Sequence, residues 1–127
     1  MVEFAVTVVA LLMLLLGIVS MARAVQIYEV VSSAAREGTR YGIAHGPTSK
    51  SPASITQIRN VVLGELTTAG LDPAALTIDV SWPSDTLVIN GTDILVQVSY
   101  PFTPQVPFTM IPKITVSSGS RMLAWRN

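Results

Sequence analysis

The chain begins with a continuous apolar run. Residues 4–22 read FAVTVVALLMLLLGIVSMA, with no charge between Glu3 and Arg23. An α-helix needs about 20 apolar residues to cross a bilayer core of roughly 30 Å, and within lipid such a run must be a helix to satisfy its own backbone hydrogen bonds. The pattern therefore predicts a helix that can cross a membrane. No basic residue precedes Glu3, so a basic leader was either removed or never present, and we expect removal.

Beyond Arg23 the pattern becomes that of an amphipathic helix. Polar residues recur at steps of three and four, which is typical of one helical face. They are Arg23, Gln26, Glu29, Ser33, Arg36 and Arg40. We predict one helix from about Val2 to about Tyr41, roughly 60 Å long at 1.5 Å per residue. Only its first half fits a membrane, so the second half must lie against the rest of the chain or against other subunits.

A second helix is predicted after a loop at residues 42–50. Ser51 suits the N-cap and Pro52 the first helical position, and Gly70 suits the end. One apolar face follows from Ile55, Ile58, Val62, Leu66 and Ala69.

The apolar period then changes to two, which predicts strands over residues 76–82, within 86–100, and from about Lys113 to Trp125. Asn90-Gly91 is a turn signal; with Thr92 it is also a glycosylation sequon, but the turn is the stronger interpretation. Gly119 is expected to mark a bulge. The fold class is α+β: a long N-terminal hydrophobic helix, then a small head with one further helix on a roughly three-stranded antiparallel sheet. We divide the chain into residues 1–44 and a head of residues 45–127.

Composition argues against most kinds of chemistry. The chain has 127 residues, no net charge and no cysteine, and only 13% of its residues are charged. No basic stripe suggests a nucleic-acid partner, and disulfides, zinc–thiolate sites and thiol catalysis are excluded. The single His45 has no second histidine nearby for a metal. Asp79, Asp85 and Asp93 resemble outward-facing or turn residues, so we expect neither an enzyme nor a cofactor.

The long helix carries candidate residues for helix packing. Glu3, next to Phe4, is either an exposed residue favoured by the helix dipole or a buried one paired with the amino group of a neighbouring subunit. Gly17 and Ser20 are either small residues that a membrane helix simply tolerates, or positions at which a second helix approaches closely. Small residues gather in the segment 32–42, where Gly38 costs about 1 kcal/mol relative to alanine. Either the head or a neighbouring subunit packs on them; the candidates are Ala34, Ala35, Gly38 and Gly42.

Residues 102–112, FTPQVPFTMIP, form an apolar segment rich in proline. Proline excludes a central strand, so we predict a loop. It either folds over the open face of the sheet or forms an exposed contact patch for another subunit. The candidate contact residues are Phe102, Val106, Phe108 and Met110.

Three segments together resemble the TadE-like family. They are VEFA at residues 2–5, the leucine-rich span ending in Gly17-Ile18, and AAREGTRYG at residues 34–42. The resemblance implies a pilin-like protein of tight-adherence pili, a branch of the type IV filament superfamily. A prepilin peptidase would remove its leader, and an inner-membrane platform with an ATPase would move it into a filament whose helices bundle in the centre. Glu3 matches the family's acidic residue, although in type IV pilins generally that residue is fifth.

The resulting hypothesis is a structural subunit of an extracellular type IV-like pilus, which polymerises with itself or with other pilins. Its head would lie outside the cytoplasm while the helix is in the inner membrane, and the assembled filament would lie on the cell surface. Two alternatives stay open. One is a minor pseudopilin that primes or caps a filament of another subunit, and the other is a monomeric membrane-anchored binding module.

Overall fold

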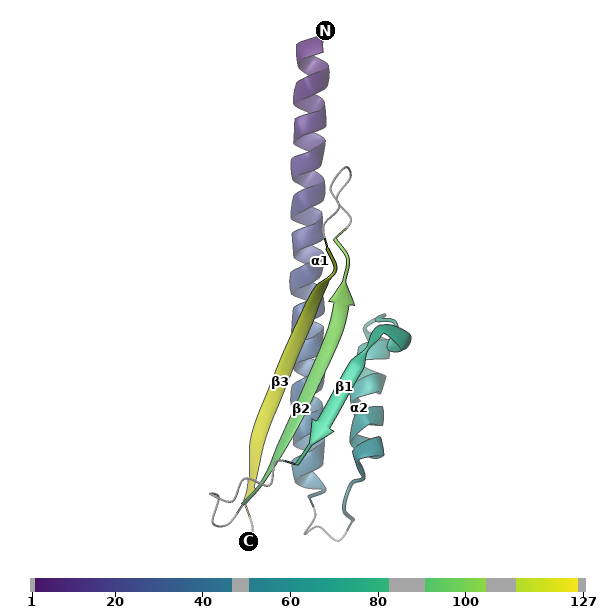
Figure 1. Ribbon diagram of the computed structural model, residues 1–127, viewed down its shortest axis with the longest axis vertical. Helices are drawn as coiled ribbons and strands as arrows, with labels where there is room; N and C mark the ends of the chain where they lie inside the picture. The colour runs from purple at the N-terminus through teal and green to yellow at the C-terminus, as the bar shows by residue number, and fades with distance from the viewer. Residues whose placement is uncertain (1, 47–50, 83–90, 105–111, 126–127) are drawn as a thin grey trace.

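The computed structural model describes residues 2–46, 51–82, 91–104 and 112–125. Two α-helices, a short 3-10 turn and three strands follow one another along the chain (Figure 1). Their bounds are α1 Val2–Ala44, α2 Ile55–Thr68, η1 Pro73–Ala75, β1 Thr77–Ser81, β2 Gly91–Phe102 and β3 Ile114–Trp125. The α+β fold with a long N-terminal helix and a three-stranded antiparallel sheet is confirmed.

Helix α1 is a single element of 43 residues, about 65 Å long at 1.5 Å per residue. It continues three residues past the predicted end at Tyr41, and Gly42 and Ile43 in this last turn still pack against the head. Its N-terminal half projects beyond the head, whereas its C-terminal half runs along the sheet (Figure 1). The molecule is therefore a stalk with a head attached along its far half.

The sheet has the order β1-β2-β3, with both pairs antiparallel. β2 and β3 pair without a break from Gly91↔Trp125 to Phe102↔Ile114. The predicted bulge at Gly119 is therefore wrong, since this residue pairs with Gln97 in the regular ladder. An added Cβ at Gly119 would come no nearer than 4.0 Å to a neighbouring atom, so glycine is tolerated there without being needed to bend the strand.

The predicted loop beginning at Phe102 is also partly wrong, because Pro101 and Phe102 belong to β2. The pairing of β1 with β2 ends at Thr77↔Ser99. Pro101 therefore lies where β2 has lost its second neighbour, and there a residue without an N–H group is tolerated.

The core lies between one face of the sheet and the two helices. α1 packs over β2 and β3, and α2 packs beside α1 and next to β1. The buried core residues are Val31, Ala34 and Ala35 of α1, Ile58, Val62 and Leu66 of α2, Ile78 and Val80 of β1, and Ile94, Val96 and Val98 of β2. Because α1 contributes to this core, the predicted boundary between residues 44 and 45 runs through one packed unit, and the division itself stays a prediction.

Three elements converge at Gly38. A Cβ added there would lie 2.4 Å from Cγ2 of Val62 in α2 and 3.4 Å from Cγ1 of Val96 in β2. One turn further, a Cβ at Gly42 would lie 2.2 Å from Cδ1 of Ile94. The glycines thus let α1 approach both α2 and the sheet more closely than any larger residue allows.

Helix α2 begins later than predicted. Its N-cap is Ser54, whose hydroxyl accepts a hydrogen bond from the Gln57 N–H at 3.2 Å, while the Gln57 side chain accepts from the Ser54 N–H at 2.9 Å. This reciprocal capping box satisfies two backbone donors, which Ser51 and Pro52 could not do from three residues upstream. The predicted end is confirmed, since Gly70 has a φ of 81° immediately after the C-cap.

Gly38→Ala is expected to lower the free energy of unfolding by about 1–3 kcal/mol, because overpacking forces neighbours off their rotamers and the β-branched Val62 has little freedom to move. Gly64→Ala is the matched control: nothing lies within 4 Å of its Cβ position, so alanine should stabilise α2 by about 0.5–1 kcal/mol. Thermal unfolding of the full chain in detergent, followed by circular dichroism, measures both. Equal midpoints for the two variants would contradict the packing at Gly38.

Ser54→Ala is expected to lower the free energy of unfolding by about 1 kcal/mol, since the capping hydroxyl is lost. Thr56→Ala, in the exposed first turn of the same helix, is the comparison. Urea titration of the two variants in the same detergent separates a capping effect from general replacement of a hydroxyl. A Ser54→Ala variant as stable as the parent chain would show that the box adds nothing.

Candidate functional site

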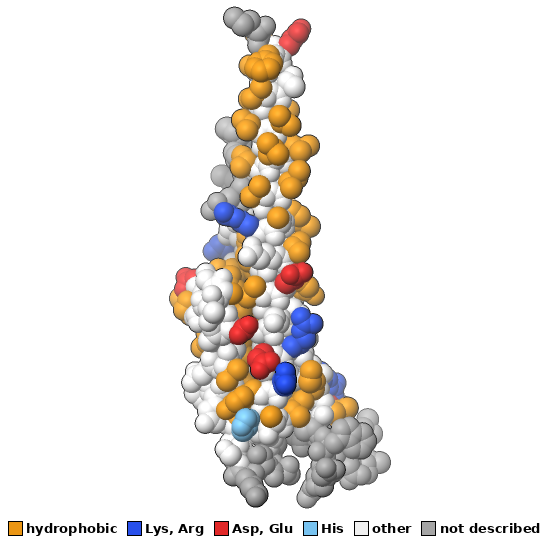
Figure 2. Space-filling view, turned by 180° about the vertical axis from the view of Figure 1, so that it is seen from behind, with side chains coloured by type: hydrophobic (Ala, Val, Ile, Leu, Met, Phe, Trp, Pro, Cys, Tyr) orange, Lys and Arg blue, Asp and Glu red, His pale blue; other side chains and the backbone are white. Residues whose placement is uncertain are grey.

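The first half of α1 is apolar and largely uncovered by the rest of the chain. We call residues 2–22 the apolar half of α1. Within the most apolar 18-residue window of the helix only 6% of the residues are buried. Figure 2 shows hydrophobic side chains along this stalk, with most charged side chains lower down, beside the head. Within the described residues, α1 is the one helix long and apolar enough to cross a membrane.

Burial distinguishes this helix from the core helix of a soluble protein, which would be mostly covered. Val2 is 78% exposed and Phe4 76% exposed, and the large side chains up to Met21 are exposed as well. Soluble monomers seldom expose more than a few hundred Å² of contiguous apolar surface, and larger patches mark contacts with proteins or membranes. The apolar half of α1 is therefore a candidate transmembrane helix and the main candidate contact surface.

Glu3 lies in the first turn of α1 and is exposed. Its backbone carbonyl accepts a hydrogen bond from the Thr7 hydroxyl at 2.8 Å, and the positive end of the helix dipole favours its carboxylate. The first turn of α1, which includes Glu3 and Phe4, lies at the N-terminal end of the stalk, far from the head (Figure 1). Both are accessible to a neighbouring molecule, and the pairing of Glu3 with a cation stays a prediction.

The small residues of α1 fall into two groups. Ala34, Ala35, Gly38 and Gly42 are buried against the head of their own chain, which matches the interpretation that the head packs on them. Gly17 belongs to the exposed stalk, where an added Cβ would meet nothing within 4 Å. Gly17 is therefore the glycine of α1 that a second helix could approach.

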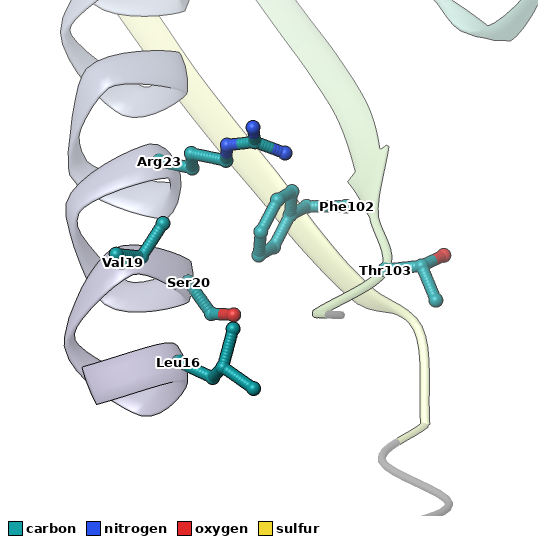
Figure 3. Close-up of a pocket in the computed structure, with 6 residues that line it drawn as sticks. All are labelled: Leu16, Val19, Ser20, Arg23, Phe102 and Thr103. Atoms are coloured by element: carbon teal, nitrogen blue, oxygen red, sulfur yellow. The ribbon is translucent and has the colours of Figure 1, made fainter. Parts of the chain in front are cut away.

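Ser20 marks the point where the head reaches the stalk. It is only 8% exposed and lines a pocket of about 210 Å³ between α1 and the end of β2. The other lining residues are Leu16, Val19, Arg23, Phe102 and Thr103. In Figure 3 the Phe102 ring points toward α1, Arg23 extends from α1 over the same space, and Thr103 turns away.

Phe102 is therefore half-buried against its own stalk and is not an exposed loop residue. The other candidates of the contact loop, Val106, Phe108 and Met110, lie outside the described residues, as does Asn90. Sequence analysis identified Arg23 as the end of the apolar run and the first residue of the polar helical face, but not as a residue of a pocket. The signal that could have singled it out is the aromatic residue at position 102, but no sequence pattern places that ring opposite Arg23.

The titratable residues of the head form no catalytic group in the described part of the chain. The His45 ring packs on Tyr41 with centroids 4.4 Å apart, and its Nδ1 lies 3.2 Å from the Tyr41 carbonyl oxygen. No group of three residues able to hold a metal ion occurs among the described residues. Asp79 is exposed on the outer face of the sheet, and Asp85 lies outside the described residues.

Asp93 differs from the solvated residue that sequence analysis expects. It faces the outer side of the sheet but is only 4% exposed, and Arg121 of the adjacent strand pairs with it. The Arg121 Nε donates to Oδ2 at 2.8 Å, and a second guanidinium nitrogen reaches the same oxygen. Oδ1 has no hydrogen-bond partner within the described structure. The pair joins β2 to β3.

Comparison with known proteins gives one match. The family model of the TadE-like protein matches residues 1–40, which are nearly the whole of α1. The resemblance to this family is thus confirmed for that segment. No curated protein and no solved structure matches the chain. With the exposed apolar helix, the match fits a pilin-like protein related to tight-adherence pili, a structural family rather than a catalytic one.

Arg121→Ala is expected to lower the free energy of unfolding by about 1–3 kcal/mol, because it leaves the Asp93 carboxylate buried without its cation. Adding Asp93→Asn should restore part of the loss, since the amide carries no charge that needs a partner. Asp79→Asn, at an exposed position of β1, should change stability by less than about 0.5 kcal/mol. Thermal unfolding of the three variants beside the parent chain tests this, and an Arg121→Ala chain as stable as Asp79→Asn would contradict it.

Proposed function

We propose that this chain, whose residues 1–40 match the TadE-like family, is a structural subunit of an extracellular pilus related to type IV filaments. The observation that carries the proposal is the apolar half of α1, which the chain itself leaves uncovered. Such a surface must be covered by lipid or by other helices. The subunit would use both in turn: lipid while it is stored in the inner membrane, and the helices of other copies in the filament.

The shape of the chain supports this use. The core of the head packs on the C-terminal half of α1, and the end of β2 reaches the stalk only near Ser20, so most of the exposed half is open to a helix bundle. Helix bundling at the centre would leave the heads outside. Transfer from lipid to such a bundle gains little from hydrophobicity, because lipid tails are as apolar as leucine. The preference must come from packing, for example at Gly17, and from contacts between heads, with an ATPase on a membrane platform supplying the work.

Glu3 would set the register of the bundle. A carboxylate carried into an apolar bundle needs a cation, because burying an unpaired charge is strongly unfavourable. In the inner membrane the same residue would stay at the bilayer surface, where water and the helix dipole stabilise it. The carboxylate thus makes assembly selective for one axial position. The candidate partner is the amino group of a neighbouring copy, exposed by the prepilin peptidase when the leader is cleaved.

A minor pseudopilin and a monomeric anchored module would have the same stalk as a main pilus subunit. The amount of this chain in the filaments therefore distinguishes the three roles. Filaments sheared from the cell surface are examined by electron microscopy, and their subunits are identified by mass spectrometry. This chain should be the main component. Trace amounts in filaments of another subunit would instead indicate a priming or capping role, and complete retention in the membrane would indicate an anchored module.

Glu3→Ala is expected to lower the yield of sheared filaments at least tenfold while leaving the amount of membrane-inserted protein unchanged, because only the assembled state buries this carboxylate. Glu37→Ala is the matched control, since it removes one exposed carboxylate from the head-bound half of the same helix. Quantitative immunoblots of the sheared and membrane fractions give both yields. Normal filaments from Glu3→Ala would refute the role of this residue.

A further inference from the structure

Arg23 lies one membrane thickness from Glu3. The two residues are 20 positions apart on one uninterrupted helix, with no charge between them. At 1.5 Å per residue this is about 30 Å, which equals the thickness of a typical bilayer core. With Glu3 at one surface of the membrane, Arg23 therefore reaches the opposite surface, at the level of the lipid headgroups.

The pocket beside Arg23 is polar at one end and apolar at the other. Along α1 its lining runs from Leu16 through Val19 to Arg23, so the apolar end faces the membrane interior and the charged end faces the head. Phe102 closes the side opposite α1 (Figure 3). This is the polarity of a phospholipid, whose acyl chains enter the bilayer and whose phosphate lies at its surface.

The guanidinium of Arg23 has donors to offer. No hydrogen bond or ion pair of Arg23 occurs within the described residues, whereas Arg121 pairs with Asp93 and Arg59 donates to the Ile78 carbonyl. The residues three and four positions from Arg23 on the helix are Val19, Ser20, Gln26 and Ile27, and none is acidic. A second pocket on the other side of Arg23 is lined by Gln26, Ile27, Val30, Ala69 and Leu71, again without a carboxylate.

We propose that this pocket holds the phosphate group of a membrane phospholipid. Arg23 donates two parallel hydrogen bonds to the phosphate oxygens, the geometry for which a guanidinium is suited. The first carbons of the acyl chains lie against Leu16, Val19 and Phe102. The inference rests on the membrane stage of the proposed function, and not on filament assembly.

The size of the pocket fits part of a lipid. Its volume of about 210 Å³ is below the range of roughly 300–1,000 Å³ that encloses a drug-sized ligand. It has room for a phosphate and its glycerol carbons, while the acyl chains remain in the surrounding bilayer. The bound headgroup would fix how far the stalk sits in the membrane and hold the tip of the sheet at its surface.

The full chain, purified in dodecyl maltoside, is titrated with phosphatidylglycerol, and bound lipid is counted by native mass spectrometry. Arg23→Gln should weaken binding about tenfold or more, as expected for loss of a charge-assisted hydrogen bond. The lipid affinity of Arg23→Lys should lie between those of the parent chain and Arg23→Gln, because lysine keeps the charge but not the paired donors. Arg36→Gln makes the same change of net charge at an exposed position of α1 and should bind like the parent chain. Phe102→Ala should also weaken binding, through the apolar end of the pocket.

Equal binding by Arg23→Gln and Arg36→Gln would overturn the proposal. So would equal binding of diacylglycerol with the same chains, since the phosphate would then be irrelevant. Displacement by millimolar inorganic phosphate would mean a site for soluble anions, and an Arg23-dependent dimer in place of the lipid would mean a site for a second copy. Alkaline extraction of the membranes tests insertion separately. An inserted chain without Arg23-dependent lipid binding refutes this inference alone, and a chain that is not inserted refutes the membrane stage of the proposed function.

Discussion

The close contact between α1 and the head is the interaction on which the rest of the structure depends. It is made by a row of alanine and glycine residues, so that side chains of α2 and of the sheet pack directly on the backbone of α1. A head of three strands and one further helix has a small core. Small domains bury little surface, so a head with a still smaller core would not be stable. By contributing Val31, Ala34 and Ala35, α1 completes that core. The same helix that leaves its first half uncovered is thus indispensable to folding in its second half.

Much of the fold could be predicted from periodicity. The change from a continuous apolar run to a helical period and then to a period of two corresponds to a stalk, a head-bound helix and a sheet. The errors lie where local signals compete. Ser51-Pro52 and Ser54 both resemble caps, and Gln57 makes the latter the stronger one by a reciprocal hydrogen bond. Gly119 suggested irregular backbone, but it does not interrupt a ladder of twelve residue pairs.

The candidate site was less predictable than the fold. A sequence pattern can identify a residue that makes a contact, but it does not show which residue lies opposite. The small residues at 34–42 were compatible with a head or with a neighbour, and only the three-dimensional arrangement shows that Val62, Val96 and Ile94 occupy their surface. Asp93 follows the alternation of an outward-facing residue, yet it is buried and pairs with its diagonal neighbour Arg121. Arg23 and Phe102 are 79 positions apart in the chain, so no local pattern could bring them into one pocket.

The continuity of α1 has a mechanical consequence. The helix runs from Val2 to Ala44 without a kink-forming proline, and the sheet is attached along its side rather than at its end (Figure 1). Tension applied along the stalk is carried by α1 and by whatever grips its exposed half, and the strands lie parallel to that load path rather than in series with it. A pull along the axis therefore need not peel β2 from β3. The head can be stretched only by forces that act across the helix, such as a load on the head itself.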